Sequence, residues 1–212
     1  MKEKNTTTEE KIIQVATKLF ANKGYDGTST REICKAANIN ISLISYYFGG
    51  KKELYKKIVD KIVENVISYM KNKFNFKELP KNFDYLTKEE KIKHLFVCLD
   101  VMIDYFYSDK VSDLEFMIIF REQMTSGVLI NAEGYNVFKK LLASIIEKDE
   151  NDREVILRTI TIIGQVQSAN IFKQFSLSMM NQSGYSKEDI QVLKQIIIDQ
   201  VKSILMGLGA KC

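Results

Sequence analysis

The side chains with the most distinctive chemistry lie between residues 42 and 52. A short run of hydroxyl, phenol and aliphatic groups contains no acidic residue: Ser42, Leu43, Ser45, Tyr46 and Tyr47. Such groups can contact the donors, acceptors and thymine methyl groups of a DNA major groove. Gly49-Gly50 follows and allows a sharp turn, after which Lys51 and Lys52 open a helix whose free N–H groups can hold a phosphate. The pattern predicts recognition of a DNA duplex.

Two short helices must position these groups. Ser29 followed three residues later by Glu32 is a capping box, so a first helix is expected to begin there. Asn38-Ile39-Asn40 interrupts it, because asparagine tolerates left-handed backbone and competes with helical hydrogen bonds. The last residue of that joint is a favourable N-cap for a second helix over residues 41–47.

The apolar spacing predicts how these helices pack. Ile44 and Phe48 lie four residues apart and are expected to face inward, which leaves the hydroxyls and phenols outside. An earlier helix begins with a capping box of Thr7 and Glu10 and ends before Gly24. The three helices are expected to form a helix-turn-helix domain over residues 1–50.

Other chemistry is poorly represented. The sequence contains no glycine-rich phosphate loop and no serine-nucleophile motif, and His94 has no partner in a recognisable motif. Cys34, Cys98 and Cys212 lack the spacing of a zinc site or a disulfide framework. We therefore expect no enzyme activity, no metal site and no cofactor.

Composition predicts an all-α protein. The 212 residues are 45% hydrophobic and 27% charged, and a single proline is present to interrupt helices. Capping signals and apolar stripes predict about nine helices and no strand. A long helix over about residues 51–73 is expected to link the first domain to a second one, residues 51–212.

Positive charge is concentrated near the N-terminus. Residues 1–60 carry 11 Lys and Arg against 7 Asp and Glu, whereas the other 152 residues carry 20 of each. Such a local excess suits a polyanionic partner. The first residues lack an apolar signal segment, and no stretch approaches about 18 apolar residues, so a cytoplasmic protein without membrane contact is expected. The frequent use of Lys, Asn and Ile over Arg and Ala is typical of an A·T-rich bacterial genome.

Residues 9–63 resemble the DNA-binding domain of the TetR/AcrR family of transcriptional repressors. The resemblance rests on KLFANKGYDGTSTREICKAANINISLISYYFGGKKELY, which combines the patterns G-Y-x-x-T-[ST]-x-R-x-I and Y-Y-F-x-x-K-x-x-L. It implies base contacts from Ile41, Ser42, Leu43, Ser45 and Tyr46, and phosphate contacts from Thr28, Thr30, Tyr47 and Lys51. Family members often carry glycine where this chain has Asn38, and many place Lys or Arg near the start of the recognition helix. Without such a cation, an operator rich in A·T pairs is expected.

The second domain is rich in methionine and aromatic residues, which line irregular cavities but also fill ordinary cores. The segments FREQMTSG and ITIIGQVQ resemble a TetR branch with CecR-type C-terminal domains, which implies a small effector and dimerisation. Candidate effector residues are Met102, Tyr105, Met117, Phe120, Arg121 and Gln165. Arg121 and Gln165 lie in apolar runs and need partners. The partner is either a ligand or another side chain, such as Glu115 or Glu122 for Arg121.

The last two helices are expected to form a homodimer interface. The apolar stripe of the final helix supplies Ile190, Leu193, Ile197, Val201 and Ile204. One short helix reads few base pairs, so a twofold pair reading half-sites about 34 to 36 Å apart is expected. The leading hypothesis is a homodimeric repressor that binds a palindromic DNA operator and is released by a small apolar or aromatic effector. The alternative is a helical scaffold or adaptor whose N-terminal bundle contacts proteins.

Overall fold

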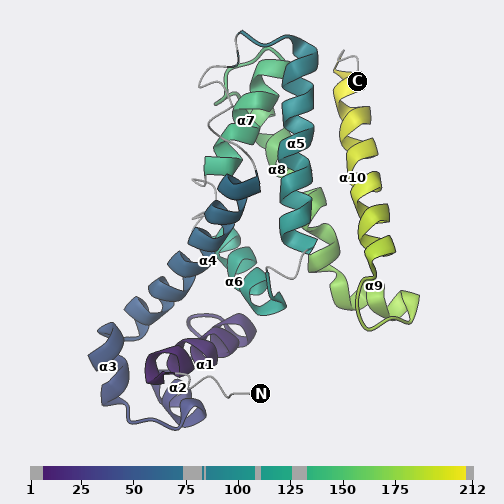
Figure 1. The fold of residues 1–212 in the computed structure, drawn as a ribbon. Coiled ribbons are helices and arrows are strands. Elements are labelled where there is room, and N and C mark those ends of the chain that lie inside the picture. The colour runs from purple at the N-terminus through teal and green to yellow at the C-terminus, as the bar shows by residue number, and fades with distance from the viewer. Residues whose placement is uncertain (1–6, 74–82, 84, 108–110, 126–132, 209–212) are drawn as a thin grey trace. The chain divides into compact units, whose positions relative to one another are not determined.

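A computed structural model describes residues 7–73, 83, 85–107, 111–125 and 133–208 (Figure 1). These described residues form α-helices and no strand, as the composition predicts. The helices are α1 (Thr8–Lys23), α2 (Thr30–Ala37), α3 (Ser42–Phe48), α4 (Lys51–Lys73), α5 (Lys88–Tyr107), α6 (Asp113–Thr125), α7 (Glu133–Ile145), α8 (Arg153–Ile171), α9 (Lys173–Met180) and α10 (Lys187–Gly207). Their packing divides the chain into a first unit, Met1–Val66 with Ser112–Leu129, and a second unit, Ile67–Val111 with Ile130–Cys212.

This division differs from the expected domains of residues 1–50 and 51–212. The helix α4 begins in the first unit and continues into the second. The helix α6, expected in the second domain, packs on α1 in the first. A hydrogen bond also joins α6 to α4, because the Tyr55 hydroxyl donates to Glu122 Oε1 at 2.6 Å. The first unit is therefore larger than a three-helix domain.

The first unit has an apolar core supplied mainly by α1 and α4. Ile12, Phe20 and Leu54 are buried there. The expected capping box at the start of α1 is present, since Thr7 and Glu10 exchange side-chain and backbone hydrogen bonds at 2.9 and 3.2 Å. Burial of the α1 stripe explains why this helix braces the two that follow.

The helix α2 is held at both ends as the sequence predicts. Ser29 and Glu32 form its capping box, and Asn38 closes it in left-handed conformation with φ of 50°. The exposed Glu32 carboxylate also accepts from Lys23 Nζ at 2.7 Å. The Lys23 bond and the Ser29 bonds lower the Glu32 pKa to about 2. The carboxylate thus remains charged at the helix N-terminus, where negative charge is favourable.

The helix α3 begins and ends one residue later than the predicted range 41–47. Ile41 is the N-cap residue and provides no side-chain cap. Asn40 nevertheless assists, because its Oδ1 accepts from the Ser42 backbone N–H at 3.0 Å. Gly49 ends the helix in left-handed conformation, with φ of 81°. The joint expected from the asparagines is therefore confirmed, with a shift in the helix boundary.

The second unit is built on α5, α7, α8 and α10. Tyr105, Phe138 and Leu141 are among its fully buried side chains. Side-chain hydrogen bonds to backbone carbonyls join α5 to α8: Asn170 Nδ2 donates to Phe106 O at 2.9 Å, and Tyr107 donates to Val166 O at 2.6 Å. Burial raises the pKa of Tyr107, so the phenol remains a donor.

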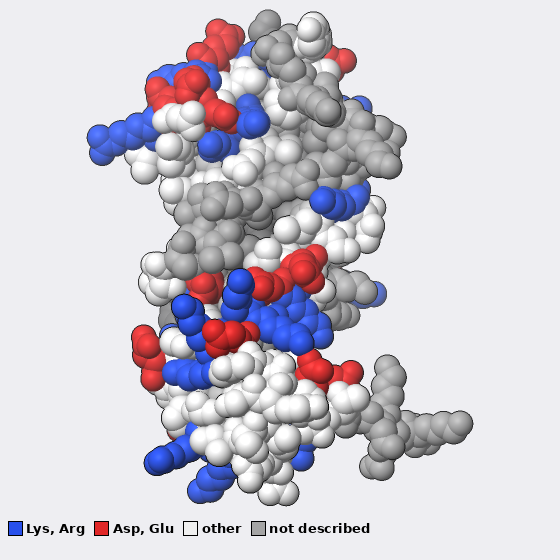
Figure 2. Space-filling view, turned by 90° about the vertical axis from the view of Figure 1, so that its left-hand side faces the viewer, with Lys and Arg blue, Asp and Glu red and all other residues white. Residues whose placement is uncertain are grey.

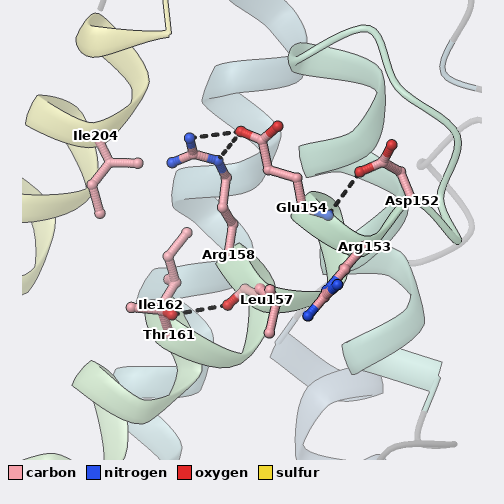
Figure 3. Close-up of a pocket in the computed structure, with 8 residues that line it drawn as sticks. All are labelled: Asp152, Arg153, Glu154, Leu157, Arg158, Thr161, Ile162 and Ile204. Atoms are coloured by element: carbon pink, nitrogen blue, oxygen red, sulfur yellow. Dashed lines mark hydrogen bonds and ion pairs between the residues drawn. The ribbon is translucent and has the colours of Figure 1, made fainter.

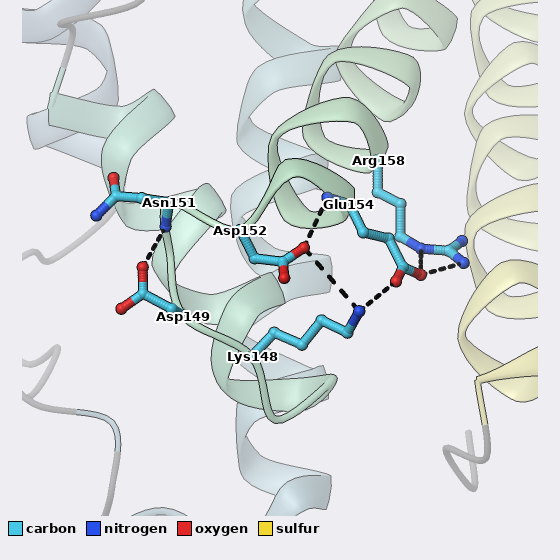
Figure 4. Close-up of polar contacts among 6 residues, drawn as sticks. All are labelled: Lys148, Asp149, Asn151, Asp152, Glu154 and Arg158. Carbon is cyan, nitrogen blue, oxygen red and sulfur yellow. Dashed lines mark hydrogen bonds and ion pairs between the residues drawn. The ribbon is translucent and has the colours of Figure 1, made fainter.

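Asn151 followed three residues later by Glu154 predicts a helix cap at Asn151, and the start of α8 differs from this prediction. Asp152 is the N-cap and accepts from the Glu154 N–H at 2.7 Å, while Asn151 donates its own N–H to Asp149 (Figure 4). Lys148 then bridges Asp152 and Glu154, at 4.0 and 2.5 Å. The lysine makes the closer pairing with Glu154, and both carboxylates lie at the helix N-terminus.

The apolar pattern that follows Asn151 predicts one helix to about Met180, which is wrong, because α8 ends at Ile171 and α9 follows at an angle of 56°. The Ala169 carbonyl, which would accept from residue 173 in a continuous helix, instead accepts from the Tyr185 hydroxyl at 2.9 Å. Tyr185 also hydrogen-bonds Ser176 in α9. In the described part of the chain, no single helix meets the length and hydropathy required to cross a membrane, although α8 and α9 do so as a bent pair.

We expect Ser29→Ala to lower the free energy of unfolding by about 1 kcal/mol, because α2 loses its N-cap acceptor. Ser45→Ala removes an exposed hydroxyl within α3 and serves as the control, with an expected change below about 0.5 kcal/mol. Urea unfolding followed by circular dichroism measures both. Equal stability of the two variants would show that the capping box contributes nothing measurable.

Candidate nucleic-acid interface

The outward face of α3 carries the polar and aromatic groups that the sequence places there. Ile44 and Phe48 are buried against the first unit, whereas the side chain of Tyr46 is 79% exposed and that of Ile41 is 50% exposed. Ser42, Ser45 and Tyr47 are exposed and Leu43 is half-buried. The inward and outward positions thus agree with the four-residue spacing. Contact of this face with DNA remains a prediction.

Two phenols dominate this surface. The rings of Tyr46 and Tyr47 have centroids 5.0 Å apart and meet edge to face, at 83°. Tyr47 also lies 6.2 Å from the buried ring of Phe48. Edge-to-face contacts restrict both rings. The Tyr46 hydroxyl is therefore presented to solvent by a side chain that has lost part of its rotational freedom.

The Gly49-Gly50 turn leads directly into α4. Both residues have positive φ, 81° and 146°, so a side chain at either position would be strained. Lys51, the first residue of α4, is half-buried with Nζ 4.0 Å from the centroid of the Tyr25 ring. Lys52 is exposed. The Lys51 ammonium is thus positioned beside the turn by a cation–π contact, and both lysines lie in the first turn of α4.

An acidic side chain that the sequence reasoning missed lies at the same turn. A Cβ added to Gly50 would be 3.2 Å from Glu53 Oε2. Glu53 therefore reaches back to the N-terminus of α4, where a carboxylate interacts favourably with the free N–H groups. A phosphate bound there must displace this carboxylate. Its position three residues after Gly50 was the available signal, since Asp and Glu are common in the first turn.

Thr28 is misplaced in the expected set of phosphate contacts. Its side chain is 1% exposed, and its hydroxyl donates to Gly24 O at 2.8 Å. The hydroxyl closes the connection between α1 and α2 and is not available to DNA. Thr30, the first residue of α2, is half-buried and remains at a helix N-terminus. The candidate interface therefore includes Thr30 and omits Thr28.

The surface around this face has an uncharged centre. Figure 2 views the molecule from the side of α3 and α4 and shows an uncharged area on the N-terminal unit, bordered by acidic and basic side chains above and by basic side chains below. Acidic and basic side chains are mixed along the neighbouring surface, which α4 contributes in part. An uncharged centre suits base contacts within a groove, and the basic side chains at its margin can contact phosphates.

The six candidate effector residues do not form one site within a unit. Met102, Tyr105 and Gln165 lie in the second unit, where the first two are buried. Met117, Phe120 and Arg121 lie in α6 of the first unit. Tyr105 contacts Tyr69 with ring centroids 5.1 Å apart, so it forms part of an ordinary core. The six residues are divided between the two units, and their grouping around one effector stays a prediction.

The two polar candidates keep unusual surroundings. Gln165 Oε1 and Arg121 Nε are covered by protein, and neither has a hydrogen-bond partner among the described residues. Arg121 Nη2 faces Asn22 O at 3.5 Å. The suggested ion pairs of Arg121 with Glu115 or Glu122 are not formed. The Glu115 carboxylate accepts from the Ser112 backbone N–H, and the Glu122 carboxylate accepts from the Tyr55 hydroxyl.

The candidate dimer residues are only partly accessible. Ile197 and Val201 are buried in the core of their own second unit, so assigning them to a dimer interface is wrong. Ile190, Leu193 and Ile204 are half-buried. The exposed apolar residues of α10 are instead Val192, Ile196 and Met206. A stripe that packs on α5 and α8 cannot at the same time pack on another protomer.

The two described cysteines are buried and unpaired. Burial raises the pKa of Cys34 and raises that of Cys98 to about 12. Both thiols therefore remain protonated and behave as small core residues.

Two family models match the chain. Residues 12–58 match bacterial regulatory proteins of the tetR family, and residues 92–208 match the C-terminal domain of the HTH-type transcriptional dual regulator CecR. These are families of transcriptional regulators, which are not enzymes.

Individual proteins support both matches. The chain is 26% identical to CecR of Shigella flexneri over 219 aligned residues, covering 98% of this chain and 96% of CecR. It is 48% identical to the HTH-type regulator YttP of Bacillus subtilis over 58 residues, only 27% of this chain and 28% of YttP. The crystal structure of a TetR-like regulator from Rhodococcus sp. RHA1 has the same fold, with a TM-score of 0.55, 14% identity and coverage of 95% of this chain and 99% of that chain.

Thr28→Val should lower the free energy of unfolding by about 1–3 kcal/mol, because the Gly24 carbonyl loses its partner at a buried site. Thr28→Ser keeps the hydroxyl and should recover most of that loss. Below the unfolding transition, both variants should bind DNA within about twofold of the parent chain. Weaker DNA binding by a fully folded Thr28→Val protein would show that Thr28 does contribute to DNA binding.

Proposed function

Because the chain belongs to the TetR family of bacterial regulators with a CecR-type C-terminal domain, we propose that it is a ligand-responsive repressor that binds a palindromic operator as a homodimer. The observation that carries the DNA-binding part is the exposed face of α3, which has hydroxyl and phenol groups but no carboxylate. Such a regulator acts on the chromosome in the bacterial cytoplasm.

The proposed contacts follow from the exposure of each side chain. Base edges are read by Ile41, Ser42, Leu43, Ser45 and Tyr46. Phosphates are held by Thr30, Tyr47, Lys51 and Lys52. Hydroxyl and phenol groups can donate or accept, so they tolerate several base patterns, whereas the missing arginine removes a strong guanine contact. An operator whose contacted positions are mostly A·T is therefore proposed.

A second copy of the chain is proposed to cover an apolar face on α8 and α10. The outward stripe of α8 includes Leu157, Ile160 and Ile171, all exposed. Gly164 belongs to the same stripe, and a Cβ added there would meet nothing within 4 Å. A helix from another protomer could approach α8 closely at that glycine. On α10, the exposed Val192, Ile196 and Met206 would continue the interface.

A hollow between α8 and α10 supports this surface. Its volume is about 470 Å³, and Leu157, Ile162 and Ile204 are among its lining residues. Figure 3 shows Ile204 of α10 facing α8, with Arg158 held beside it by Glu154. In a dimer, side chains of the second copy would fill this hollow. Four helices, two from each copy, would then form the seam.

Repression and its release follow from dimer geometry. The helix-turn-helix units of two protomers bind one palindrome only if their spacing matches half-sites about one turn of the DNA duplex apart. The helix α4 is continuous from residue 51 to residue 73, so it connects the turn beside α3 with the second unit. A ligand that alters the packing around α4 would change the spacing between the two helix-turn-helix units and lower the affinity of the dimer for DNA. By linkage, bound DNA would lower the affinity for that ligand by the same factor.

We expect Tyr46→Ala to weaken operator binding about tenfold or more, because a base-reading side chain is lost. Tyr85→Ala is the matched control, since Tyr85 is 87% exposed and lies in the second unit. Fluorescence anisotropy with the DNA upstream of the chain's own gene, against random duplex, measures both.

The same titration separates DNA binding from a scaffold function. Phosphate contacts require affinity to fall steeply with salt, and Lys52→Gln should reduce the slope of log K against log salt by about one. Equal affinity for the operator and random DNA at every salt concentration would contradict the regulator function.

Ile160→Glu should shift the protein towards monomer, because it places a charge on the proposed seam. Val97→Glu is the control: Val97 is 41% exposed on α5, against 52% for Ile160 on α8. Sedimentation velocity over a range of concentrations reports the association state. A dimer that tolerates Ile160→Glu as well as it tolerates Val97→Glu would place the interface elsewhere.

A further inference from the structure

We propose that the first unit binds a small aromatic carboxylate in the cavity between the end of α1, the first turns of α4 and the end of α6. The binding itself does not depend on the proposed function. Its effect on DNA does rest on that function, so the two are tested separately.

The cavity has the size and walls of a ligand site. Its volume is about 860 Å³, within the range of roughly 300–1,000 Å³ usual for small-molecule pockets. Its apolar and aromatic walls come from Tyr25, Tyr55, Val59 and Met124. Three segments distant in the sequence thus line one open hollow within a single unit.

Arg121 supplies the chemical specificity. Its Nε is covered and has no acceptor among the described residues. Its one described hydrogen bond, from Nη2 to Asn22 O, is long at 3.5 Å. A guanidinium has five N–H donors that match a carboxylate in two parallel bonds. Because Nε is covered, a ligand carboxylate on the cavity side would accept from the two Nη groups, whose one described hydrogen bond is long.

The backbone is shaped around this guanidinium. A Cβ added to Gly24 would come within 3.3 Å of Arg121 Nη1, and Gly24 has φ of +75°. The glycine therefore serves both the turn after α1 and the close approach of Arg121. The same loop continues through Tyr25 to Thr28, whose hydroxyl closes it.

The charges around the cavity, Arg121 included, nearly cancel. Its lining includes four basic residues and three acidic ones: Lys23, Lys52, Lys56 and Arg121 against Asp26, Asp60 and Glu122. Lys23 is paired with Glu32, and Glu122 accepts from Tyr55. A nearly neutral lining attracts anions weakly at long range. Selection of a carboxylate must therefore depend on the local fork of Arg121.

The aromatic walls select the body of the ligand. The Tyr25 and Tyr55 rings have centroids 5.1 Å apart and are tilted by 55°. Tyr55 also packs edge to face on Phe20, at 4.8 Å. Burial and the bond to Glu122 raise the pKa of Tyr55, so its hydroxyl stays protonated and fixed. A flat ring can pack on these walls while its carboxylate reaches Arg121.

Occupancy of this cavity would oppose DNA binding. The wall residues Tyr25 and Gly27 lead directly into the N-cap of α2, and Lys52 lines the cavity as well as the proposed DNA face. An anion in the cavity would draw the Lys52 ammonium away from a phosphate. Linkage then requires that the bound ligand lower the affinity for the operator, and the bound operator the affinity for the ligand, by the same factor.

The probe pair is 3-phenylpropionate and 3-phenylpropanamide, which share one shape and differ in charge. Ligand-observed NMR titration of the full chain without DNA should give saturable binding of the acid, with the amide about tenfold weaker or more. Arg121→Gln should weaken the acid about tenfold and leave the amide nearly unchanged. Arg121→Lys, which keeps the charge without the fork, should give an intermediate affinity.

Two further variants separate the site from general charge effects. Met124→Glu adds a carboxylate at a 72% exposed position on the cavity wall and should weaken only the acid. Lys18→Gln removes an exposed charge from α1 at a position outside the cavity lining and should change nothing. Circular dichroism confirms that each variant is folded.

Equal binding of acid and amide, unchanged acid binding in folded Arg121→Gln, or no binding of the acid at several millimolar would each overturn the site. Operator titration with and without saturating 3-phenylpropionate then tests the coupling. Operator binding that is strong but insensitive to the bound acid would support the ligand site and the regulator function and would contradict the coupling between them. Acid binding without any operator binding would retain the site and reject the regulator function.

Discussion

The burial of two side chains on α3 is the constraint on which the candidate DNA-binding surface depends. A helix of seven residues, Ser42–Phe48, is too short to be stable alone in water. Ile44 and Phe48 anchor it to the first unit, with exposures of 0% and 8%. Once these two face inward, the pitch of the helix determines that Ser42, Ser45 and Tyr46 face outward. Packing of the anchor residues therefore positions the candidate contacts.

The turns on both sides of α3 add to this constraint. Asn38 and Gly49 adopt left-handed backbone, and the Thr28 hydroxyl closes the loop before α2. Lys51 is fixed over Tyr25, which belongs to that same loop. The N-terminal end of α4 and the connection between α1 and α2 are thus joined through one aromatic ring. A change in the loop would reach the lysines without unfolding either helix.

The assignment of α6 to the first unit changes how effector control can be understood. Tyr55 joins α4 to Glu122, and Arg121 lies against Gly24 at the end of α1. These contacts place a cavity and an under-satisfied guanidinium beside the helix-turn-helix elements themselves. Under the proposed function, control of DNA binding by a ligand would not require a signal from the second unit. Local repacking around Tyr25, Tyr55 and Arg121 would suffice.

Local rules determined much of this protein from its sequence. The capping boxes at Thr7 and Ser29, the joint at Asn38 and the inward spacing of Ile44 and Phe48 could be predicted, because each involves residues at most four positions apart. The families of both halves were identified from their motifs and are confirmed by the matching models.

Only the tertiary structure decided features that depend on distant partners. Tyr185 ends α8 by occupying the Ala169 carbonyl, and a local pattern contains no sign of that bond. Val201 is an apolar residue that could have faced a second protomer or its own core, and only packing on α5 and α8 shows which. The sequence predicted that Arg121 needs a partner. The fold places it beside Gly24, 97 residues earlier in the chain, because α6 packs on α1.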